Sequence, residues 1–266
     1  MIELLQRDFV QVALLAAMLV SLSAGLVGYF VVIRQNIFFT HTLSHIGFPG
    51  AVLAILIGLD PSWGLIIFST AAGLIFTWSK PRTENDDLGT GIILVLSMAL
   101  GLVLTRFSVS ASKSLEALLF GNIFVVTKQQ LLLYAGIAIL VVFILASLFK
   151  PLLYSSILEK EALAKGVNGP MLSHLYIVLL SLVVAVSVQV VGALLIFALL
   201  VLPPAAAIKM VSAPTRAFLV SPLIAMLCAV GGVILSLAID LPASFCIVVL
   251  ATLIYLIAIG VKKWLN

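Results

Sequence analysis

Eight long stretches without a charged residue dominate this sequence, and they limit what the chain can fold into. A helix needs roughly 20 apolar residues to cross the hydrocarbon core of a bilayer, and all but one of the stretches have about that length. The chain is 64% hydrophobic and 9% charged, whereas soluble domains are about 25% charged. This composition excludes a soluble enzyme, a disordered chain and a nucleic-acid-binding domain, and it predicts an all-α polytopic membrane protein. The stretches are Phe9–Ile33, Ile37–Leu59, Pro61–Ser79, Leu88–Thr105, Leu131–Phe149, Leu175–Ile208, Ala217–Ile239 and Pro242–Val261.

The sixth stretch, Leu175–Ile208, is too long for one ordinary span and short for two. Gly192 lies near its middle, and glycine adopts the backbone angles that a sharp hairpin needs. If the chain turns there, it has nine spans, with the N-terminus outside and the C-terminus in the cytoplasm. Ten of the 14 basic residues then lie inside. Without the turn only six lie inside, against the positive-inside rule. We therefore expect nine spans, with eight as the alternative.

The loops between these spans are short. The longer ones are Lys80–Asp87 and Lys150–Pro170 on the expected inner side and Arg106–Gln130 on the outer side. None is long enough to fold as a soluble domain. Residues 1–266 are therefore expected to form a single transmembrane domain.

Two histidines in the second stretch are the strongest candidates for chemistry inside the membrane. His41 and His45 are four residues apart, which places both imidazoles on one face of a helix. Ionisable residues in spans are costly and usually functional, and two neutral imidazoles can share a divalent cation such as zinc. The alternative is a pair of structural histidines bonded to neighbouring helices. Of these readings we favour a metal site.

A proline close behind the histidines predicts a break in their helix. Pro49 has no amide hydrogen, so the carbonyl of His45 loses its helical partner. Gly47 and Gly50 flank this position. Broken helices at membrane depth are tolerated where they line a cavity. A break at Pro49 and Gly50 would therefore fit a gated pathway, whereas a simple packing kink is the alternative.

Other sequence features narrow the chemistry. The chain contains no G-x-x-x-x-G-K-S/T motif, so it is not expected to hydrolyse ATP. His174 stands at the expected inner interface, and Gln189 precedes Gly192, where its amide can bond across helices. We expect structural roles for both residues.

Three stretches of the chain are similar to a known family. Residues 36–50, NIFFTHTLSHIGFPG, resemble the family's F-F/G-G-D-A-L-S-H-A-x-L-P-G, and residues 161–168, EALAKGVN, resemble its inner loop E-x-A-x-A-x-G-I. Residues 189–207, QVVGALLIFALLVLPPAAA, resemble Q-x-V-G-x-L-L-x-x-A-L-L-x-I-P-A-A-T-A, the most specific motif of the three. A weaker fourth match covers residues 118–127. On these motifs the chain resembles the permease subunit of the zinc, manganese and iron ABC importers.

The resemblance implies a type II ABC importer fold and a set of partners. Such permeases form homodimers, bind two ABC ATPase subunits on the cytoplasmic side and receive metal from an extracytoplasmic binding protein, in the bacterial plasma membrane. No tightly bound cofactor and no nucleic acid is expected. The residues expected to couple to the ATPase are Pro203, Pro204, Ala205, Ala206, Ala207 and Lys209, with Ala162, Ala164 and Gly166 of the inner loop.

One departure from the family pattern concerns the metal. His41 stands where the family usually has Asp, whereas His45 matches the family's histidine. The resemblance places the transported metal at these two positions. Carboxylate suits manganese, and imidazole suits zinc, copper, iron or nickel. The substitution therefore favours zinc slightly over manganese or iron as the transported ion.

These observations lead to one hypothesis and two competitors. Metal passes between two permease subunits and lodges near His41 and His45, while ATP binding moves the inner helices around Pro203 and Pro204. Pro49, Gly50 and Gly192 are the expected helix-break or gating positions. A stand-alone ion-coupled secondary transporter would show repeats and broken helices in both halves. A membrane-embedded metalloenzyme would need a third ligand or a general base beside the histidine pair.

Overall fold

The computed structural model describes residues 7–78, 86–107, 121–157, 162, 166 and 168–265. Nine helices in this part of the chain are long and apolar enough to cross a membrane, as the nine-span prediction requires. A short 3₁₀ helix precedes the fifth of them. The elements are α2 (Asp8–Ile33), α3 (Ile37–Leu56), α4 (Pro61–Trp78), α5 (Asp86–Thr105), η1 (Ile123–Val125), α7 (Lys128–Ile157), α9 (Gly169–Val191), α10 (Ala193–Met210), α11 (Pro214–Ile239) and α12 (Ala243–Leu265).

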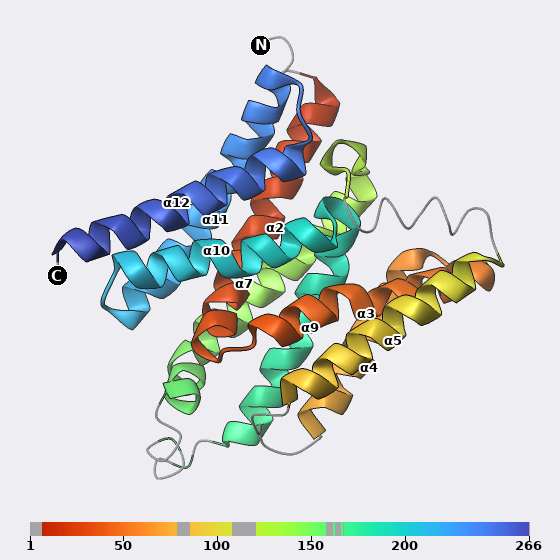
Figure 1. Cartoon of the computed structure of the whole chain (residues 1–266), viewed down its shortest axis with the longest axis horizontal. Helices are drawn as coiled ribbons and strands as arrows, with labels where there is room; N and C mark the ends of the chain where they lie inside the picture. Colours follow the sequence, from red (N-terminus) through yellow and green to blue (C-terminus); the bar gives the residue numbers. More distant parts are fainter. Residues whose placement is uncertain are drawn as a thin grey trace.

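The described turns separate to two opposite sides of the molecule. On the left of Figure 1 lie the α2–α3 turn with Arg34, the α10–α11 turn and the end of α12, and we call this the Arg34 side. To the right of them lie the α3–α4 turn with Asp60 and the α9–α10 junction, which we call the Asp60 side. The charge distribution predicts that the Arg34 side is cytoplasmic.

The histidine-bearing helix is the most enclosed of the spans. Within the subunit, 78% of the span in α3 is buried, against 22% in each of α4, α5, α7 and α12. Helix α3 packs against α4, α5, α9 and α10, and Figure 1 shows it crossing the middle of the molecule. Peripheral helices therefore shield α3 and leave their own apolar side chains exposed.

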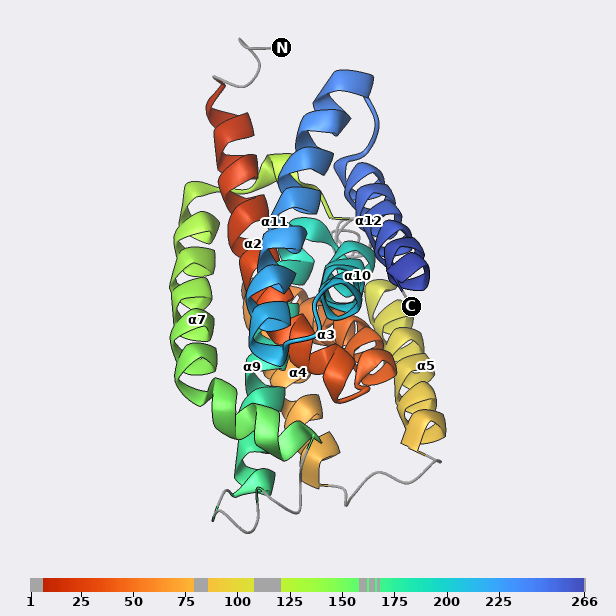
Figure 2. The same cartoon turned by 90° about the vertical axis from the view of Figure 1, so that its left-hand side faces the viewer.

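The sixth uncharged stretch does divide at Gly192. This glycine ends α9 and precedes α10 with φ 83° and ψ 160°, backbone angles that favour glycine. Gly121 packs against the junction, because a Cβ added there would lie 2.2 Å from the carbonyl carbon of Val191. Figures 1 and 2 show α10 leaving α9 at a wide angle, so the junction is a corner rather than the predicted sharp hairpin.

The predicted break at Pro49 and Gly50 is wrong in this structure. Helix α3 runs without interruption from Ile37 to Leu56, with Pro49 inside it. Gly50 serves close packing instead, because a Cβ added to it would lie 2.4 Å from the carbonyl oxygen of Gly64 in α4. Close contact with α4 therefore explains this glycine, and a packing role replaces the break.

Helix α7 extends further than the sequence predicted. The inner loop was expected to begin at Lys150, but α7 continues to Ile157, with Pro151 inside the helix. Figure 2 shows α7 bending near its lower end, and proline is a common cause of such kinks. The extra turns bring Ser155 and Ser156 to the Arg34 side.

Candidate metal centre

His41 and His45 lie side by side, as their spacing predicts. Their ring centroids are 4.8 Å apart and the ring planes are inclined by 79°. Because α3 begins at Ile37, His45 lies eight residues into the helix, or roughly 12 Å along its axis. The two imidazoles thus form one local cluster within the depth of a membrane span.

The Nδ1 atoms of both rings are buried and, within the described ranges, lack a hydrogen-bond partner. The neighbouring hydroxyls are already engaged by their own helix. Thr40 Oγ1 donates to the carbonyl of Asn36 at 2.8 Å, and Ser44 Oγ donates to the carbonyl of Thr40 at 3.1 Å. Leaving a buried polar atom unpaired costs about 1–3 kcal/mol. A ligand that binds these nitrogens would recover part of that cost.

An aromatic ring from another helix closes one side of the pair. Phe197 of α10 lies with its centroid 4.8 Å from that of His41, at an interplanar angle of 60°. His45 is only 6% exposed, whereas His41 is half-buried. His41 is therefore partly accessible while His45 is enclosed.

The pair does not form a complete metal site by itself. Among the described residues, no group of three or more His, Cys, Asp or Glu side chains could hold a metal ion. A zinc ion usually takes four ligands. The described part of the chain offers two imidazoles here, and water, a transported anion or another chain could supply further ligands.

The residues expected to couple to an ATPase differ in exposure. Pro203, Pro204, Ala206 and Ala207 are buried within the subunit, and Lys209 is exposed. A Cβ added to Gly28 of α2 would lie 2.4 Å from the carbonyl oxygen of Leu200, four residues before Pro204. Leu200 and Pro204 therefore pack against α2. Any direct contact of this segment with a partner falls to Lys209 and its exposed neighbours.

The second part of the expected coupling region lies mostly outside the described residues, and Ala164 is among those left out. Ala162 is 2% exposed. Gly166 is exposed and adopts φ 72°. Space is open around Gly166, because a Cβ added there would meet no atom within 4 Å.

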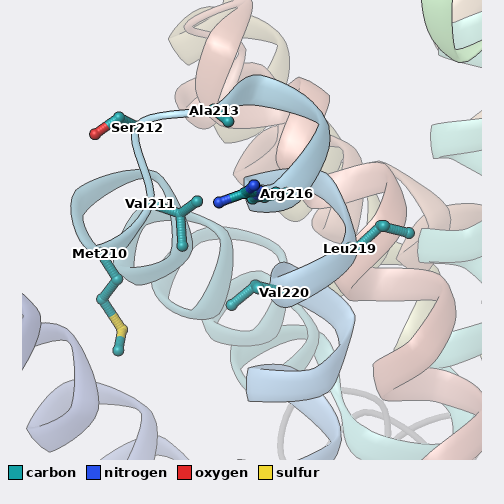
Figure 3. Close-up of a pocket in the computed structure, with 7 residues that line it drawn as sticks. All are labelled: Met210, Val211, Ser212, Ala213, Arg216, Leu219 and Val220. Carbon is teal, nitrogen blue, oxygen red and sulfur yellow. The ribbon is translucent and has the colours of Figure 1, made fainter.

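The Arg34 side carries a groove at the α10–α11 turn. It encloses about 610 Å³ and is lined by Met210, Val211, Ser212, Ala213, Arg216, Leu219 and Val220. Figure 3 shows the Arg216 side chain reaching across the turn towards Val211. The groove begins next to Lys209 and includes neither histidine of the pair. The groove is therefore separate from the histidine pair.

The other polar predictions have clear outcomes. Gln189 does bond across helices, because its Oε1 accepts from Ser62 Oγ at 3.1 Å. His174 lies in the first turns of α9, where its Nδ1 is 2.7 Å from the Pro170 carbonyl oxygen. The sequence did not single out Phe197, because nothing in the pattern separates it from other apolar residues. It also did not predict the hydrogen bonds of Arg34 to Ser155, Ser156 and Ser173, because Arg34 was counted only as a charge.

Comparison with known proteins extends over almost the whole chain. The model of the ABC 3 transport family matches residues 6–262. The manganese import system permease protein ScaB of Streptococcus parasanguinis is 30% identical over 254 residues, which cover 95% of this chain and 90% of ScaB. The high-affinity zinc uptake system membrane protein ZnuB of Buchnera aphidicola is 31% identical over 252 residues, covering 94% and 95%. A solved structure of PsaBC from Streptococcus pneumoniae in complex with Fab matches with a TM-score of 0.87 and 30% identity, covering 97% of this chain and 93% of the other.

Proposed function

The chain belongs to the ABC 3 transport family, and from that premise we propose that it passes a manganese or zinc ion through the bacterial plasma membrane by way of His41 and His45. It is the membrane permease subunit of an ABC importer, and ATP is hydrolysed by a separate subunit. The observation that carries the proposed site is the adjacent imidazole pair, with both Nδ1 atoms buried and unpaired among the described residues.

The incomplete ligand set supports a homodimer. A second copy of the chain, related by a two-fold axis, would present an equivalent histidine pair. Two such pairs supply four nitrogen ligands, the number that zinc prefers. The partial exposure of His41 is consistent with this arrangement. Metal would then pass along the interface between the subunits.

Zinc is the favoured cargo within the manganese and zinc class. The named relatives include a manganese permease and a zinc uptake protein, so the likeness alone points to both metals. The donor set distinguishes between them, because imidazole suits zinc and carboxylate suits manganese. His41 gives this chain two nitrogen donors in place of the nitrogen and carboxylate typical of the family.

The importer needs further subunits. We propose that two ATPase subunits bind the Arg34 side, at Lys209, the groove of Arg216 and the loop of residues 158–168, while a metal-binding protein docks on the Asp60 side. ATP binding would shift the population from outward-open to inward-open states. The buried contact of Pro204 with α2 is where α10 would transmit this shift. Family membership argues against a transporter that works without an ATPase.

Reconstitution tests this function. The permease and its ATPase are placed in proteoliposomes, and ATP-dependent uptake of zinc and manganese is measured for the wild type, His41→Ala and His45→Ala. His174→Ala is the matched control, because this third histidine lies on α9 away from the pair. We expect uptake to fall at least about tenfold in His41→Ala and in His45→Ala, because each loses roughly one ligand interaction. Uptake should persist in the control. If both variants import every divalent ion normally, the assignment of His41 and His45 as metal ligands is wrong. Uptake without the ATPase would favour the stand-alone transporter.

A further inference from the structure

Arg34 ties three helix ends together on the side expected to face the cytoplasm. It caps α2 at the point where the chain turns into α3. Its Nε donates to Ser156 Oγ at 2.8 Å, its Nη2 to Ser155 Oγ at 3.0 Å, and its Nη1 to Ser173 Oγ at 3.0 Å. The guanidinium carbon also lies 4.9 Å from the centre of the Tyr176 ring. One side chain thus joins the α2–α3 turn to the end of α7 and the start of α9.

The serine hydroxyls are set up to accept these bonds. Ser155 Oγ and Ser156 Oγ both donate to the carbonyl of Leu152, so each presents a lone pair to the guanidinium. Both serines belong to the part of α7 that follows Pro151. Hydrogen bonds from a charged donor are stronger than bonds between neutral groups. The guanidinium therefore holds the last turn of α7 in a defined place.

The two helix ends held by Arg34 are also the two ends of one loop. Helix α7 stops at Ile157 and α9 starts at Gly169, so residues 158–168 connect them. This loop contains the EALAKGVN motif, which the proposed function assigns to ATPase binding. In the sequence, Ser155, Ser156 and Ser173 lie within a few residues of the two ends of this loop.

On its other side, Arg34 is connected to the histidines by a short and well-bonded turn. The amide of Asn36 donates to the carbonyl of Val31 at 2.9 Å, and the amide of Thr40 donates to the carbonyl of Asn36 at 2.9 Å. Only Arg34, Gln35 and Asn36 separate the two helices. His41 follows in the second turn of α3, so displacement of this turn moves the helix that carries the pair.

We propose that Arg34 is a positioning residue that couples the end of α7 and the start of α9 to the metal-bearing helix α3. This inference rests on the proposed function, because it takes the ATPase to bind next to these two helix ends. Arginine is required because its planar fork directs three donors to three hydroxyls on two helices. Lysine would keep the charge but concentrates its donors at one point.

The first test measures coupling in proteoliposomes with the ATPase present. Metal imported per ATP hydrolysed is compared for wild type, Arg34→Ala, Arg34→Lys and the Ser155→Ala/Ser156→Ala double variant. Lys150→Ala, which removes an exposed positive charge from α7 outside the proposed ATPase-binding surface, is the control. We expect the metal imported per ATP to fall about tenfold in both Arg34 variants, because a link between two sites is removed. The zinc affinity of the permease should stay within about twofold of wild type. The double variant should show a smaller loss, and the control none.

A second test follows the movement itself and does not depend on metal transport. Spin labels are placed at Phe38 of α3 or at Ile157 of α7, each paired with a label at Leu253 of α12, all of which are exposed. The buried Cys228 and Cys246 are first replaced by alanine. In the wild-type background, trapping the ATPase with ATP and vanadate should shift both distances. In Arg34→Ala the Ile157 shift should persist, while the Phe38 shift falls below half its wild-type size.

Three results would overturn the inference. The Phe38 shift could be unchanged in Arg34→Ala, the import per ATP could be unchanged, or zinc affinity could fall in parallel with import, which would indicate a merely structural role. If the wild type imports no metal while the labels still move together, the proposed cargo is wrong and the coupling role of Arg34 stands.

Discussion

Helices α3 and α10 both carry proline in their interior, but the chain uses the two helices differently. Helix α3 passes through Pro49 without interruption and presents the histidine pair near its start. Helix α10 begins at a true change of direction, Gly192, and holds Pro203 and Pro204 buried near its other end. The change of direction depends on a glycine with positive φ, and the prolines leave both helices continuous.

The neighbours of the two helices explain this difference. Gly50 of α3 meets Gly64 of α4 backbone to backbone, which fixes the spacing of the two helices at this point. In α10, Pro204 deprives the carbonyl of Leu200 of its helical amide, and Gly28 of α2 packs directly against that oxygen. Helix α3 is therefore held where two glycines of neighbouring helices meet, whereas α10 is held at the carbonyl that Pro204 leaves without a helical partner.

The largest effect should come from filling the contact that holds α3. A Cβ on Gly64 would lie 2.0 Å from the carbonyl oxygen of Gly50, and neither backbone can yield easily. We expect Gly64→Ala to lower the free energy of unfolding by about 3 kcal/mol. The measurement is thermal unfolding of the purified permease in detergent.

Gly136 provides the matched control for that experiment. It lies inside α7, and a Cβ added there would meet no atom within 4 Å. Gly136→Ala should leave stability unchanged or raise it by up to about 1 kcal/mol through better helix propensity. Equal stability of the two variants would show that α3 and α4 separate readily, and the contrast with α10 would be lost.

The second effect concerns the corner that begins α10. Gly192 has φ 83° and ψ 160°, a region that side chains with a Cβ avoid. Gly192→Ala should cost about 2 kcal/mol of stability, again measured by thermal unfolding. Gly169→Ala is the comparison, because a Cβ at that position meets nothing within 4 Å. A stable Gly192→Ala protein with normal transport would mean that the corner tolerates another backbone path.

Much of this architecture could be predicted from single residues. The uncharged stretches gave the spans, and the placement of lysine and arginine favoured the division at Gly192, because both follow from the chemistry of the bilayer. The adjacency of His41 and His45 followed from the helical repeat. These features depend on local sequence and on the solvent, and no tertiary contact is needed to derive them.

The features that the sequence did not predict depend on neighbours distant in the chain. Pro49 was expected to break α3, but the contact of Gly50 with Gly64 in α4 accompanies a continuous helix. Phe197 covers His41 only because α10 returns across α3 after the corner. Arg34 finds three serines more than 120 residues further along the sequence. Local patterns do not contain this information.

The third effect tests whether donor chemistry at α3 selects the metal. His41→Asp restores the carboxylate typical of the family beside His45. We expect the ratio of manganese to zinc uptake to rise on the order of tenfold, or about 1.4 kcal/mol, because oxygen donors suit manganese better than imidazole does. Competition between the two ions in proteoliposome uptake provides the measurement. His41→Asn is the control, because it supplies an amide oxygen without the negative charge; an equal shift in both variants would assign the effect to the donor atom rather than to the charge.

The smallest effect should come from Pro49, and it bears directly on the comparison of the two helices. In Pro49→Ala a backbone amide returns at position 49 and can bond the carbonyl of His45, which completes a helix that is already continuous. We therefore expect the free energy of unfolding to rise by at most about 1 kcal/mol. Zinc affinity, measured by calorimetric titration, should stay within about twofold of wild type. Pro204→Ala is the matched variant, because the amide that it restores in α10 can bond the Leu200 carbonyl that packs against Gly28, and it should slow import without changing zinc affinity. A tenfold loss of zinc affinity in Pro49→Ala would contradict this division of roles, because it would make the freed carbonyl of His45 a part of the metal site.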